Sequence, residues 1–383
     1  MSSIQAELVQ RAKDLAPAIK ARAAETAAMR KPADASIREL EEAGIIQMLV
    51  PARWGGREAP FSTMMEVVEI ISAACPSTGW ITAFYIGHNA YIAKFPERTQ
   101  EEAYAARGHV LLPAASAANM EARKVDGGWE VSGRAAWGSG IMHADWVMMS
   151  GKTEDGPRAF LMPADAVEVI DCWRFTGMAG TGSNDYEARK VFVPDHRTML
   201  SAQIYGGRTE GSSIHANPFY SIPLLILAYC TILPVLTGTL NGALDAFGQV
   251  MERRVRNFSG TVVKEQQIAH ITYGEQKMAA AAAGELARGV FRQAQTLLDT
   301  VGFTVADRIA AKGQTAFIAK LCRDTVNAMM AASGASSFHE DQALQRIWRD
   351  LNTVSTHAFW DWDTTREMTG RQHFGLSVDH PLV

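Results

Sequence analysis

The stretch VSGRAAWGSGIMHADWVMM, residues 131–149, indicates how the middle of the chain folds. Strand-forming residues stand at both of its ends, and the Gly-Ser-Gly sequence between them predicts a turn. Two tryptophans, Trp137 and Trp146, bracket this turn, so the small hydroxyl of Ser139 is expected between large rings. What packs against that hydroxyl is the question that the rest of the sequence has to answer.

Similar short runs fill the neighbouring sequence. Alternating or β-branched segments bounded by Gly and Asp recur from residue 109 to about residue 195, as in GWEVSG, RAFLMP and KVFVPD. They predict a small antiparallel, barrel-like β-domain over residues 109–203. Apolar residues at three- and four-residue spacing predict helices on both sides of it, in an N-terminal domain over 1–108 and a C-terminal bundle over 204–383.

The predicted fold class is therefore α+β, mainly α, with the helices segregated from the strands. The Gly- and Ser-rich segment 204–217 has no clear period and is expected to form a linker or lid. One long helix is predicted through RRVRNF, and another from Leu344 through HAFWDWD to about residue 370. The aromatic residues of HAFWDWD then have helical spacing, which favours packing or pocket lining.

Composition narrows the function. The chain has 383 residues, 47% of them hydrophobic, and a net charge of −4, without a Lys/Arg block, so nucleic acid is not expected as a partner. The four cysteines lie far apart without metal-ligand spacing, and the charged N-terminus does not resemble a signal peptide. These features predict a cytoplasmic protein. A pair such as His143 and Asp145 is too small a ligand set, and we assign no metal.

The uncharged stretch SIPLLILAYCTILPVLTGTL, residues 221–240, is long enough to cross a bilayer. It contains Pro223 and Pro234, lacks flanking basic residues, and continues into an amphipathic segment. We therefore expect a buried helix that walls an apolar pocket, and no membrane association.

Several motifs resemble the acyl-CoA dehydrogenase fold along nearly the whole chain. The stretch 131–149 is similar to the strand pair beside the flavin of that fold, and TGMAGTGSNDYEARKVFVP (176–194) to its second flavin-binding stretch. RRVRNF with KEQQIAH is similar to the segment that reaches the flavin tail of a neighbouring subunit, and GASSFHEDQALQRIWRDL to the last core helix. The resemblance implies that Ser139 and Trp137 face a flavin.

The chemistry of a dehydrogenase is missing at the expected places. Such an enzyme needs a carboxylate to remove a weakly acidic proton. The position that often carries it, eight residues after Asp350, is Ala358, and no Glu or Asp occurs from Leu351 through Trp360. The apolar segment 224–236, the other usual location, also lacks a carboxylate. Directly before Ala358, at the first of these two places, stands His357.

A histidine there resembles the group D two-component flavin-dependent monooxygenases, whose oxygenase components act on p-hydroxyphenylacetate or phenol, indole and dibenzothiophene. Their lead-in to this histidine matches residues 332–357. Two further motifs match at Gly177, Gly180, Thr181, Gly182, Ser183 and Asp185, and at Ser77, Thr78, Gly79, Trp80 and His88. One departure is Asn89, where the family often has an apolar residue.

The resemblance implies a use for each matched residue. His357 would be the base that deprotonates the substrate, His88 would hydrogen-bond it, and Ser139 would lie near flavin N5 and restrain peroxide loss. The residues implied in flavin binding are Trp137, Ser139, Gly140, Thr181, Ser183, Arg254, Arg256, Phe258 and Gln267, although a solvated helix face explains the arginines equally well. The implied substrate pocket contains Trp80, Tyr85, Phe219, Tyr220 and Trp360.

The expected function follows from this resemblance. Reduced FMN, or FAD as the second choice, would react with O2 through a C4a-hydroperoxyflavin to hydroxylate or epoxidise a small aromatic or heteroaromatic substrate of phenol or indole type. A separate NAD(P)H-dependent flavin reductase and a homotetramer are implied as well. The alternatives are an acyl-CoA dehydrogenase or oxidase, an N- or S-oxygenase on the same fold, and a helical scaffold without flavin chemistry.

Overall fold

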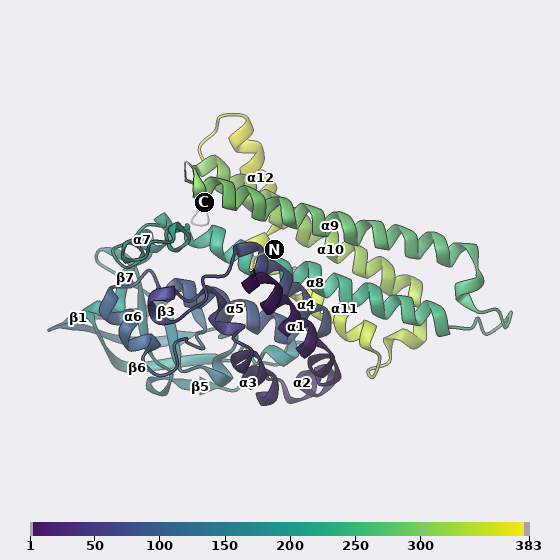
Figure 1. Cartoon of the computed structure of the whole chain (residues 1–383), viewed down its shortest axis with the longest axis horizontal. Coiled ribbons are helices and arrows are strands. Elements are labelled where there is room, and N and C mark those ends of the chain that lie inside the picture. Colours follow the sequence, from purple (N-terminus) through teal and green to yellow (C-terminus); the bar gives the residue numbers. More distant parts are fainter. Residues whose placement is uncertain (1–2, 301, 379–383) are drawn as a thin grey trace.

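The computed structural model describes residues 3–300 and 302–378, and it contains the helix, sheet and helix units that the sequence predicts (Figure 1). The helices before the sheet are α1 (Ser3–Ala21), α2 (Ala23–Met29), α3 (Asp34–Glu42), α4 (Phe61–Ala74), α5 (Pro76–Ile92) and α6 (Glu97–Tyr104). Pro76 occupies the first turn of α5, where its missing N–H costs no helical hydrogen bond. Helix α5 is buried along almost its whole length and carries Trp80, Tyr85 and His88.

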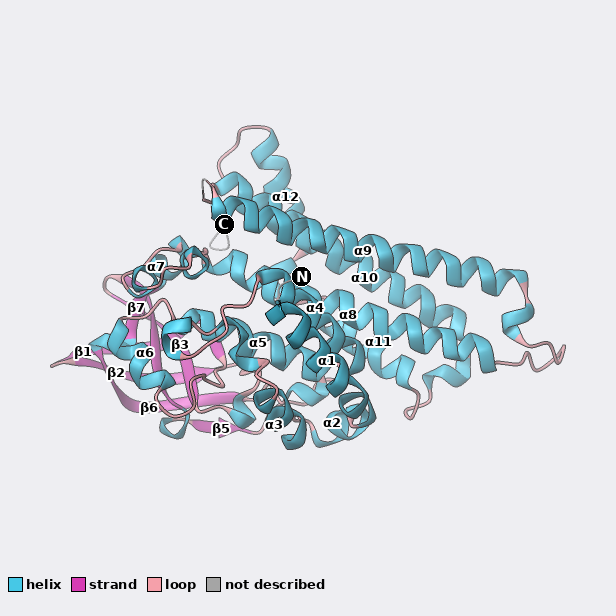
Figure 2. Ribbon diagram, viewed as in Figure 1, coloured by secondary structure: helices cyan, strands magenta, loops and turns pink. Residues whose placement is uncertain are grey.

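The central domain is a seven-stranded sheet in the described part of the chain, in the order β5-β6-β2-β1-β3-β4-β7. The strands are β1 (Ala114–Val125), β2 (Gly128–Ala135), β3 (Trp146–Thr153), β4 (Gly156–Pro163), β5 (Glu168–Ile170), β6 (Asp185–Pro194) and β7 (Thr198–Leu200). Figure 2 shows them gathered at one end of the molecule.

The prediction of a purely antiparallel sheet is wrong at one pair, because β1 and β3 run parallel. Strand β2 returns antiparallel to β1, and its other edge is occupied by β6. The chain therefore passes across the beginning of β1, through residues 136–145, and starts β3 on the far side. The Gly-Ser-Gly turn lies on this crossing.

The C-terminal bundle consists of α8 (Leu224–Arg253), α9 (Gln267–Asp299), α10 (Val305–Ser333) and α11 (Ala343–Val354), with α12 (Trp362–His373) packed on α10 (Figure 1). Thr304 and Asp307 form a capping box at the start of α10. Two predicted helices end early. Helix α8 stops at Arg253, before the rest of RRVRNF, and the last predicted helix breaks between Val354 and Trp362.

Helix α8 confirms the prediction of a buried helix. It is long and apolar enough to cross a membrane, but 94% of its most apolar 18-residue stretch is buried inside the protein. Glycines bring it close to α4. A Cβ at Gly238 would lie 2.4 Å from the carbonyl oxygen of Glu69, and one at Gly242 would lie 2.4 Å from that of Ala73. The two helices therefore pack nearly backbone to backbone.

The segment predicted as a linker or lid contains short helices. Helix α7 (Ser201–Gly206) is followed by single turns at Gly211–Ile214 and Pro218–Ser221. Lys94, which is fully buried, donates from Nζ to the carbonyl oxygens of Gly207, Tyr220 and Ile222 at 2.8, 2.9 and 2.7 Å. Because one ammonium satisfies three main-chain acceptors, this irregular segment is fastened to the end of α5.

Candidate active site

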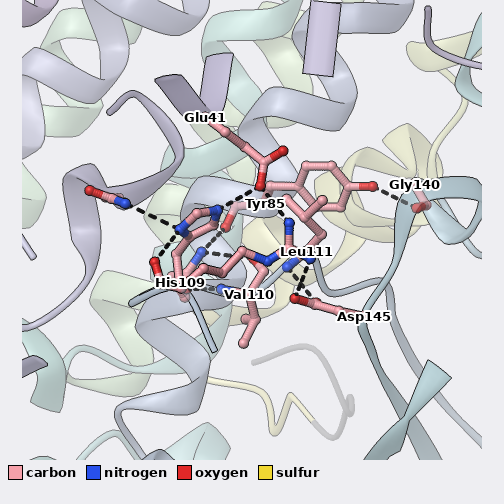
Figure 3. Close-up of polar contacts among 10 residues, drawn as sticks. Glu41, Tyr85, His109, Val110, Leu111, Gly140 and Asp145 are labelled. Carbon is pink, nitrogen blue, oxygen red and sulfur yellow. Dashed lines mark hydrogen bonds and ion pairs between the residues drawn. The ribbon is translucent and has the colours of Figure 1, made fainter. Parts of the chain in front are cut away.

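The crossing between β2 and β3 adopts a backbone that its glycines permit. Gly140 has a φ of 86°, and a Cβ there would lie 2.7 Å from the hydroxyl oxygen of Tyr85. The Tyr85 hydroxyl donates to the Gly140 carbonyl at 2.6 Å, and the Gly138 N–H donates to the Asn184 carbonyl at 2.9 Å. Tyr85 is thus used to hold the turn from the side of α5 (Figure 3).

A chain of hydroxyls answers what packs against Ser139. Trp80 Nε1 donates to Ser139 Oγ at 3.0 Å, Ser139 Oγ lies 2.8 Å from Ser183 Oγ, and Ser183 Oγ lies 2.7 Å from Thr181 Oγ1. Thr181 Oγ1 donates its hydrogen to the Met178 carbonyl at 2.8 Å.

The direction of this chain follows from its end. Each hydroxyl carries one hydrogen. Because Thr181 gives its hydrogen to a carbonyl, Ser183 must donate to Thr181, and Ser139 must donate to Ser183. Ser139 Oγ is therefore left with acceptor capacity and no hydrogen to give to a ligand.

The turn at 176–184 is held against α11 by a buried carboxyl. The Met178 N–H donates to Asp350 Oδ1 at 2.5 Å, and burial raises the pKa of Asp350 to about 6. A Cβ at Gly177 would lie 2.1 Å from the Arg349 carbonyl oxygen, so only glycine allows this approach. In the sequence, Asp350 served only as a reference position for counting. Its hydrogen bond with the Met178 N–H shows that it has a structural role.

An aromatic surface stands beside the hydroxyl chain. Trp137 has a φ of 68° and is 59% exposed, although its ring packs edge-on against Trp173 and at 5.0 Å from Phe175. Trp173 and Phe175 are themselves stacked at 4.0 Å. A large uncovered ring in a left-handed backbone is unusual for a residue whose only task is packing.

His88 is buried on α5. Its Nδ1 lies 2.5 Å from the Leu112 carbonyl oxygen, and burial lowers the pKa of the imidazole to about 4. The ring lies 4.9 Å from Phe84 and 5.1 Å from Tyr91. The imidazole is therefore neutral near pH 7.

His357 lies in the break between α11 and α12 and not within a helix, which corrects the prediction of one continuous helix. It caps the single turn Ala358–Trp360, where its Nδ1 accepts the Phe359 N–H at 3.3 Å. At the break, Lys312, which is buried on α10, donates to the Phe359 carbonyl at 2.8 Å, and Asp361 starts α12 by accepting the Thr364 N–H. Burial, and then the Lys312 ammonium, lower the pKa of His357 to about 4.

Several predicted residues meet in one aromatic cluster. Trp80 lies 5.5 Å from His357 and 4.7 Å from Phe84, which in turn contacts His88. Trp360 lies 5.8 Å from His357. Since Trp80 also binds Ser139, the hydroxyl chain and both histidines border the same cluster.

Phe219 and Tyr220 pack in a second group. Phe219 contacts Phe61 at 5.3 Å, and the Tyr220 hydroxyl donates to the Leu49 carbonyl at 3.3 Å. Both side chains are buried, and their ring contacts are with Phe61, His215 and one another. Among the described residues, these ring contacts do not include Trp80, His88 or His357, although all of the apolar members lie in the same hydrophobic core.

Of the residues predicted for the flavin tail, Arg254, Arg256 and Phe258 lie on the connection from α8 to α9, at the end of the bundle away from the sheet (Figure 1), and Gln267 is the first residue of α9. Arg254 donates to the Ala332 carbonyl, Arg256 donates to Gln266, and Phe258 is fully exposed. Arg254 and Arg256 follow the end of α8 and are not helical. The predicted helix through RRVRNF is therefore wrong here, and so is the alternative that these arginines lie on a solvated helix face.

Asn89 and Asp145 fix the start of the sheet domain. Asn89 accepts the Val110 N–H at 2.9 Å and donates to the Val110 carbonyl, while Asp145 accepts the Leu111 N–H at 2.7 Å (Figure 3). Asn89 is therefore spent on the backbone. An amide side chain in a largely apolar helix was the sequence signal that could have predicted this structural role.

No group of three or more His, Cys, Asp or Glu side chains that could hold a metal ion occurs within the described ranges. His143 instead places Nε2 2.8 Å from Asp34 Oδ1, on α3.

The order of the domains, together with an aromatic and hydroxyl-lined turn at their junction, defines a protein of the acyl-CoA dehydrogenase fold. Residues 3–107 match the family described as Acyl-CoA dehydrogenase, N-terminal domain, and residues 230–362 match Acyl-CoA dehydrogenase, C-terminal domain.

Individual relatives give the particular branch. The chain is 37% identical to a pigment production hydroxylase of Rhodococcus sp. (strain ATCC 21145), with both chains fully covered. It is 30% identical to the flavin-dependent monooxygenase, oxygenase subunit HsaA, of Rhodococcus jostii (strain RHA1), covering 98% of this chain and 100% of that one. XiaF from Streptomyces sp., solved in complex with FADH2 and glycerol, superposes with a TM-score of 0.90 at 26% identity, over 99% of this chain and 98% of that one. The chain belongs to the flavin-dependent monooxygenases built on the acyl-CoA dehydrogenase fold.

The residues at the turn fit a flavin. The uncovered Trp137 ring offers an aromatic surface to a planar ring system, and the Ser139 oxygen beside it has free acceptor capacity. A bound flavin would supply the redox chemistry. The protein would contribute orientation, through Trp137 and Ser139.

Proposed function

We propose that this chain is an oxygenase component that takes reduced flavin from a separate NAD(P)H-dependent reductase and uses O2 to hydroxylate or epoxidise a small phenol- or indole-type aromatic. Two buried, neutral histidines and an aromatic cluster suit a small aromatic ring with a hydroxyl or ring N–H. The segment from Leu351 through Trp360 offers no carboxylate for thioester chemistry. The cytoplasm, where reduced flavin is supplied, is the proposed compartment.

The observation that carries this proposal is the direction of the hydroxyl chain. Ser139 Oγ can accept a hydrogen bond and has no hydrogen left to donate. A reduced flavin carries hydrogen at N5, whereas an oxidised flavin carries a lone pair there. Ser139 therefore favours the reduced form, which is the form that an oxygenase component must capture. XiaF binds FADH2, which favours FAD over our first choice, FMN.

Anaerobic titration tests this directly. Reduced and oxidised FAD and FMN are titrated anaerobically into the parent protein and into Ser139→Ala to compare their affinities. In a second step, O2 is added together with phenol or indole, and the products are followed by mass spectrometry. The parent should prefer reduced flavin and add one oxygen atom to the aromatic. Because Ser139→Ala loses one hydrogen bond, the ratio of its affinities for reduced and oxidised flavin should be about fivefold to tenfold smaller than that of the parent. Equal affinity for both forms without oxygenated product would contradict the proposal, and bleaching by an acyl-CoA would favour a dehydrogenase.

A homotetramer completes the proposed site. Helix α9 exposes apolar side chains at helical spacing, namely Ile268, Ile271, Met278 and Leu286, which is typical of a face covered by another subunit. Such packing would bring Arg254, Arg256, Phe258 and Gln267 of one copy to the flavin tail of another. A monomer in light scattering would contradict this part of the proposal.

A further inference from the structure

Thr181 lies at the inner end of the hydroxyl chain, away from the end that a ligand can meet. Its Oγ1 lies 2.7 Å from Ser183 Oγ, which lies 2.8 Å from Ser139 Oγ, so two hydrogen bonds separate Thr181 from Ser139. Thr181 and Ser183 are buried, whereas Ser139 is partly exposed. A ligand can therefore meet the chain at Ser139, while the two inner hydroxyls are shielded from bulk water.

The Met178 peptide, at which the chain ends, is held from several sides. The Met178 N–H donates to Asp350 Oδ1 at 2.5 Å, and the Met178 carbonyl accepts the Trp173 Nε1–H at 3.0 Å. The same oxygen accepts the Thr181 hydroxyl at 2.8 Å and the Thr181 N–H at 3.1 Å. Met178 has a φ of 53°, a left-handed conformation that a residue other than glycine keeps only where its surroundings fix it. The carbonyl therefore stays beside the Thr181 hydroxyl.

Reversal of the chain is unfavourable at this end. If Thr181 donated to Ser183 instead, its oxygen and the Met178 carbonyl oxygen would face each other at 2.8 Å with no hydrogen between them. Two acceptors at that distance repel, and bulk water does not relieve the contact because both residues are buried. The Thr181 hydrogen therefore stays on the carbonyl, and the hydrogens of Ser183 and Ser139 point inwards along the chain.

Ser139 is left with one position for a ligand. Its hydrogen goes to Ser183, and its oxygen accepts the Trp80 Nε1–H at 3.0 Å. A hydroxyl oxygen can accept two hydrogen bonds, so one acceptor position remains. That position suits a ligand N–H and repels a ligand lone pair, which is the difference between N5 of reduced flavin and N5 of oxidised flavin.

We propose that Thr181 is a positioning residue for flavin selection: through Ser183 it keeps the hydrogen of Ser139 directed inwards, and the site disfavours oxidised flavin for that reason. The choice between the redox forms is then made by a side chain that donates to the main chain and not to the flavin. This role differs from the one implied by the family resemblance, in which Thr181 and Ser183 bind the flavin themselves. The inference rests on the proposed function for the identity of the ligand.

Two variants free the Ser139 hydrogen by different routes. Ser183→Ala removes the acceptor of that hydrogen, and Thr181→Val removes the hydroxyl that fixes the direction of the chain. In both variants Ser139 can donate to the N5 lone pair of oxidised flavin and can still accept from the N5–H of reduced flavin. One added hydrogen bond corresponds to about fivefold to tenfold in affinity. We therefore expect oxidised FAD to bind about fivefold to tenfold more tightly than to the parent, with the affinity for reduced FAD nearly unchanged.

Thr181→Ser and Thr325→Val are the matched controls. Thr181→Ser keeps a hydroxyl for the Met178 carbonyl and should keep the parent affinities. Thr325 is a buried residue of α10 whose hydroxyl also donates to a main-chain carbonyl, that of Leu321, at 2.7 Å. Thr325→Val therefore removes the same kind of hydrogen bond outside the hydroxyl chain, and it should bind both forms of FAD as the parent does.

The midpoint potential of bound FAD is a second readout. Tighter binding of the oxidised form makes the flavin harder to reduce, so the potential should fall in Ser183→Ala and Thr181→Val. The expected fall is about 20–30 mV, because a tenfold change in an equilibrium constant corresponds to about 30 mV for a two-electron couple. A merely structural role of Thr181 would weaken the binding of both forms and leave the potential unchanged.

The outcomes separate this inference from the proposed function. Parent values of the oxidised-FAD affinity and of the potential in both variants overturn the inference, and so does an equal loss of affinity for the two redox forms. If Thr181→Ser shifts as Thr181→Val does, the hydroxyl is not the cause and the inference is wrong. If the parent adds no oxygen to an aromatic while the variants shift as expected, the proposed function fails and the role of Thr181 stands.

Discussion

Replacing Asp350 by asparagine tests how the turn at 176–184 is held against α11. Burial raises the pKa of Asp350 from 3.8 to about 6, because ionisation would place a charge in the bundle interior. A shift of about two pKa units corresponds to about 3 kcal/mol. The carboxyl contributes this stability in full below pH 3.8 and loses it as the pH rises to about 6, since the folded state then gives up a proton it holds more tightly than the unfolded chain does.

Asparagine keeps an oxygen for the Met178 N–H and cannot ionise. With an unfolding entropy of about 2 cal/mol/K per residue, 3 kcal/mol corresponds to a shift of about 4 °C in Tm for a chain of this length. The Tm of Asp350→Asn minus that of the parent should therefore rise by about 4 °C between pH 4 and pH 7. Differential scanning fluorimetry measures it, with Asp126→Asn on the exposed β1–β2 turn as the control. A difference that stays flat or falls over this range refutes the reasoning.

Two further variants test the groups that hold the site. Ser139→Ala leaves Trp80 Nε1 without its acceptor and should lower the Tm by about 1–4 °C, the equivalent of about 1–3 kcal/mol. We also expect this variant to release more peroxide for each product molecule that it forms. An unchanged Tm and an unchanged peroxide yield would contradict this. Lys94→Met leaves three carbonyls unpaired, so we expect a Tm at least about 4 °C lower and faster tryptic cleavage at Arg208 in the same segment; parent-like cleavage would show that Lys94 does not fasten it.

Much of the arrangement could be predicted because local patterns decide it. The apolar run 224–240 is buried, and α9 follows its alanine-rich pattern from Gln267 to Asp299. The resemblance assigned Ser139, Thr181 and Ser183 to flavin binding, and the structure joins the three side chains by hydrogen bonds. Their use in flavin binding remains a prediction.

The predictions from sequence fail where residues that are distant in sequence determine the backbone conformation. The apolar spacing of α11 continues through His357, so no local signal marks the end of that helix at Val354. The turn that follows is held by Lys312, which is 47 residues away in sequence from its acceptor at Phe359. The parallel pairing of β1 and β3 is equally invisible locally, because both strands alternate in the same manner whichever direction the partner runs.

Four buried side chains near the aromatic cluster share one task, which is to bond main-chain groups of irregular segments. Main-chain groups outside helices and strands need partners from elsewhere when water is excluded. Each irregular segment next to the aromatic cluster has such a partner: Asn89 for Val110, Tyr85 for Gly140, Asp350 for Met178, and Lys312 for Phe359.

Because these partners fix the backbone, they also fix what the backbone presents. The Phe359 N–H faces Nδ1 of His357, and the Met178 carbonyl sets the direction of the hydroxyl chain that ends at Ser139. A substitution that leaves His357 and Ser139 in place but frees one of these segments should therefore alter the hydrogen or the acceptor that the side chain offers, and with it the chemistry, without removing the side chain itself.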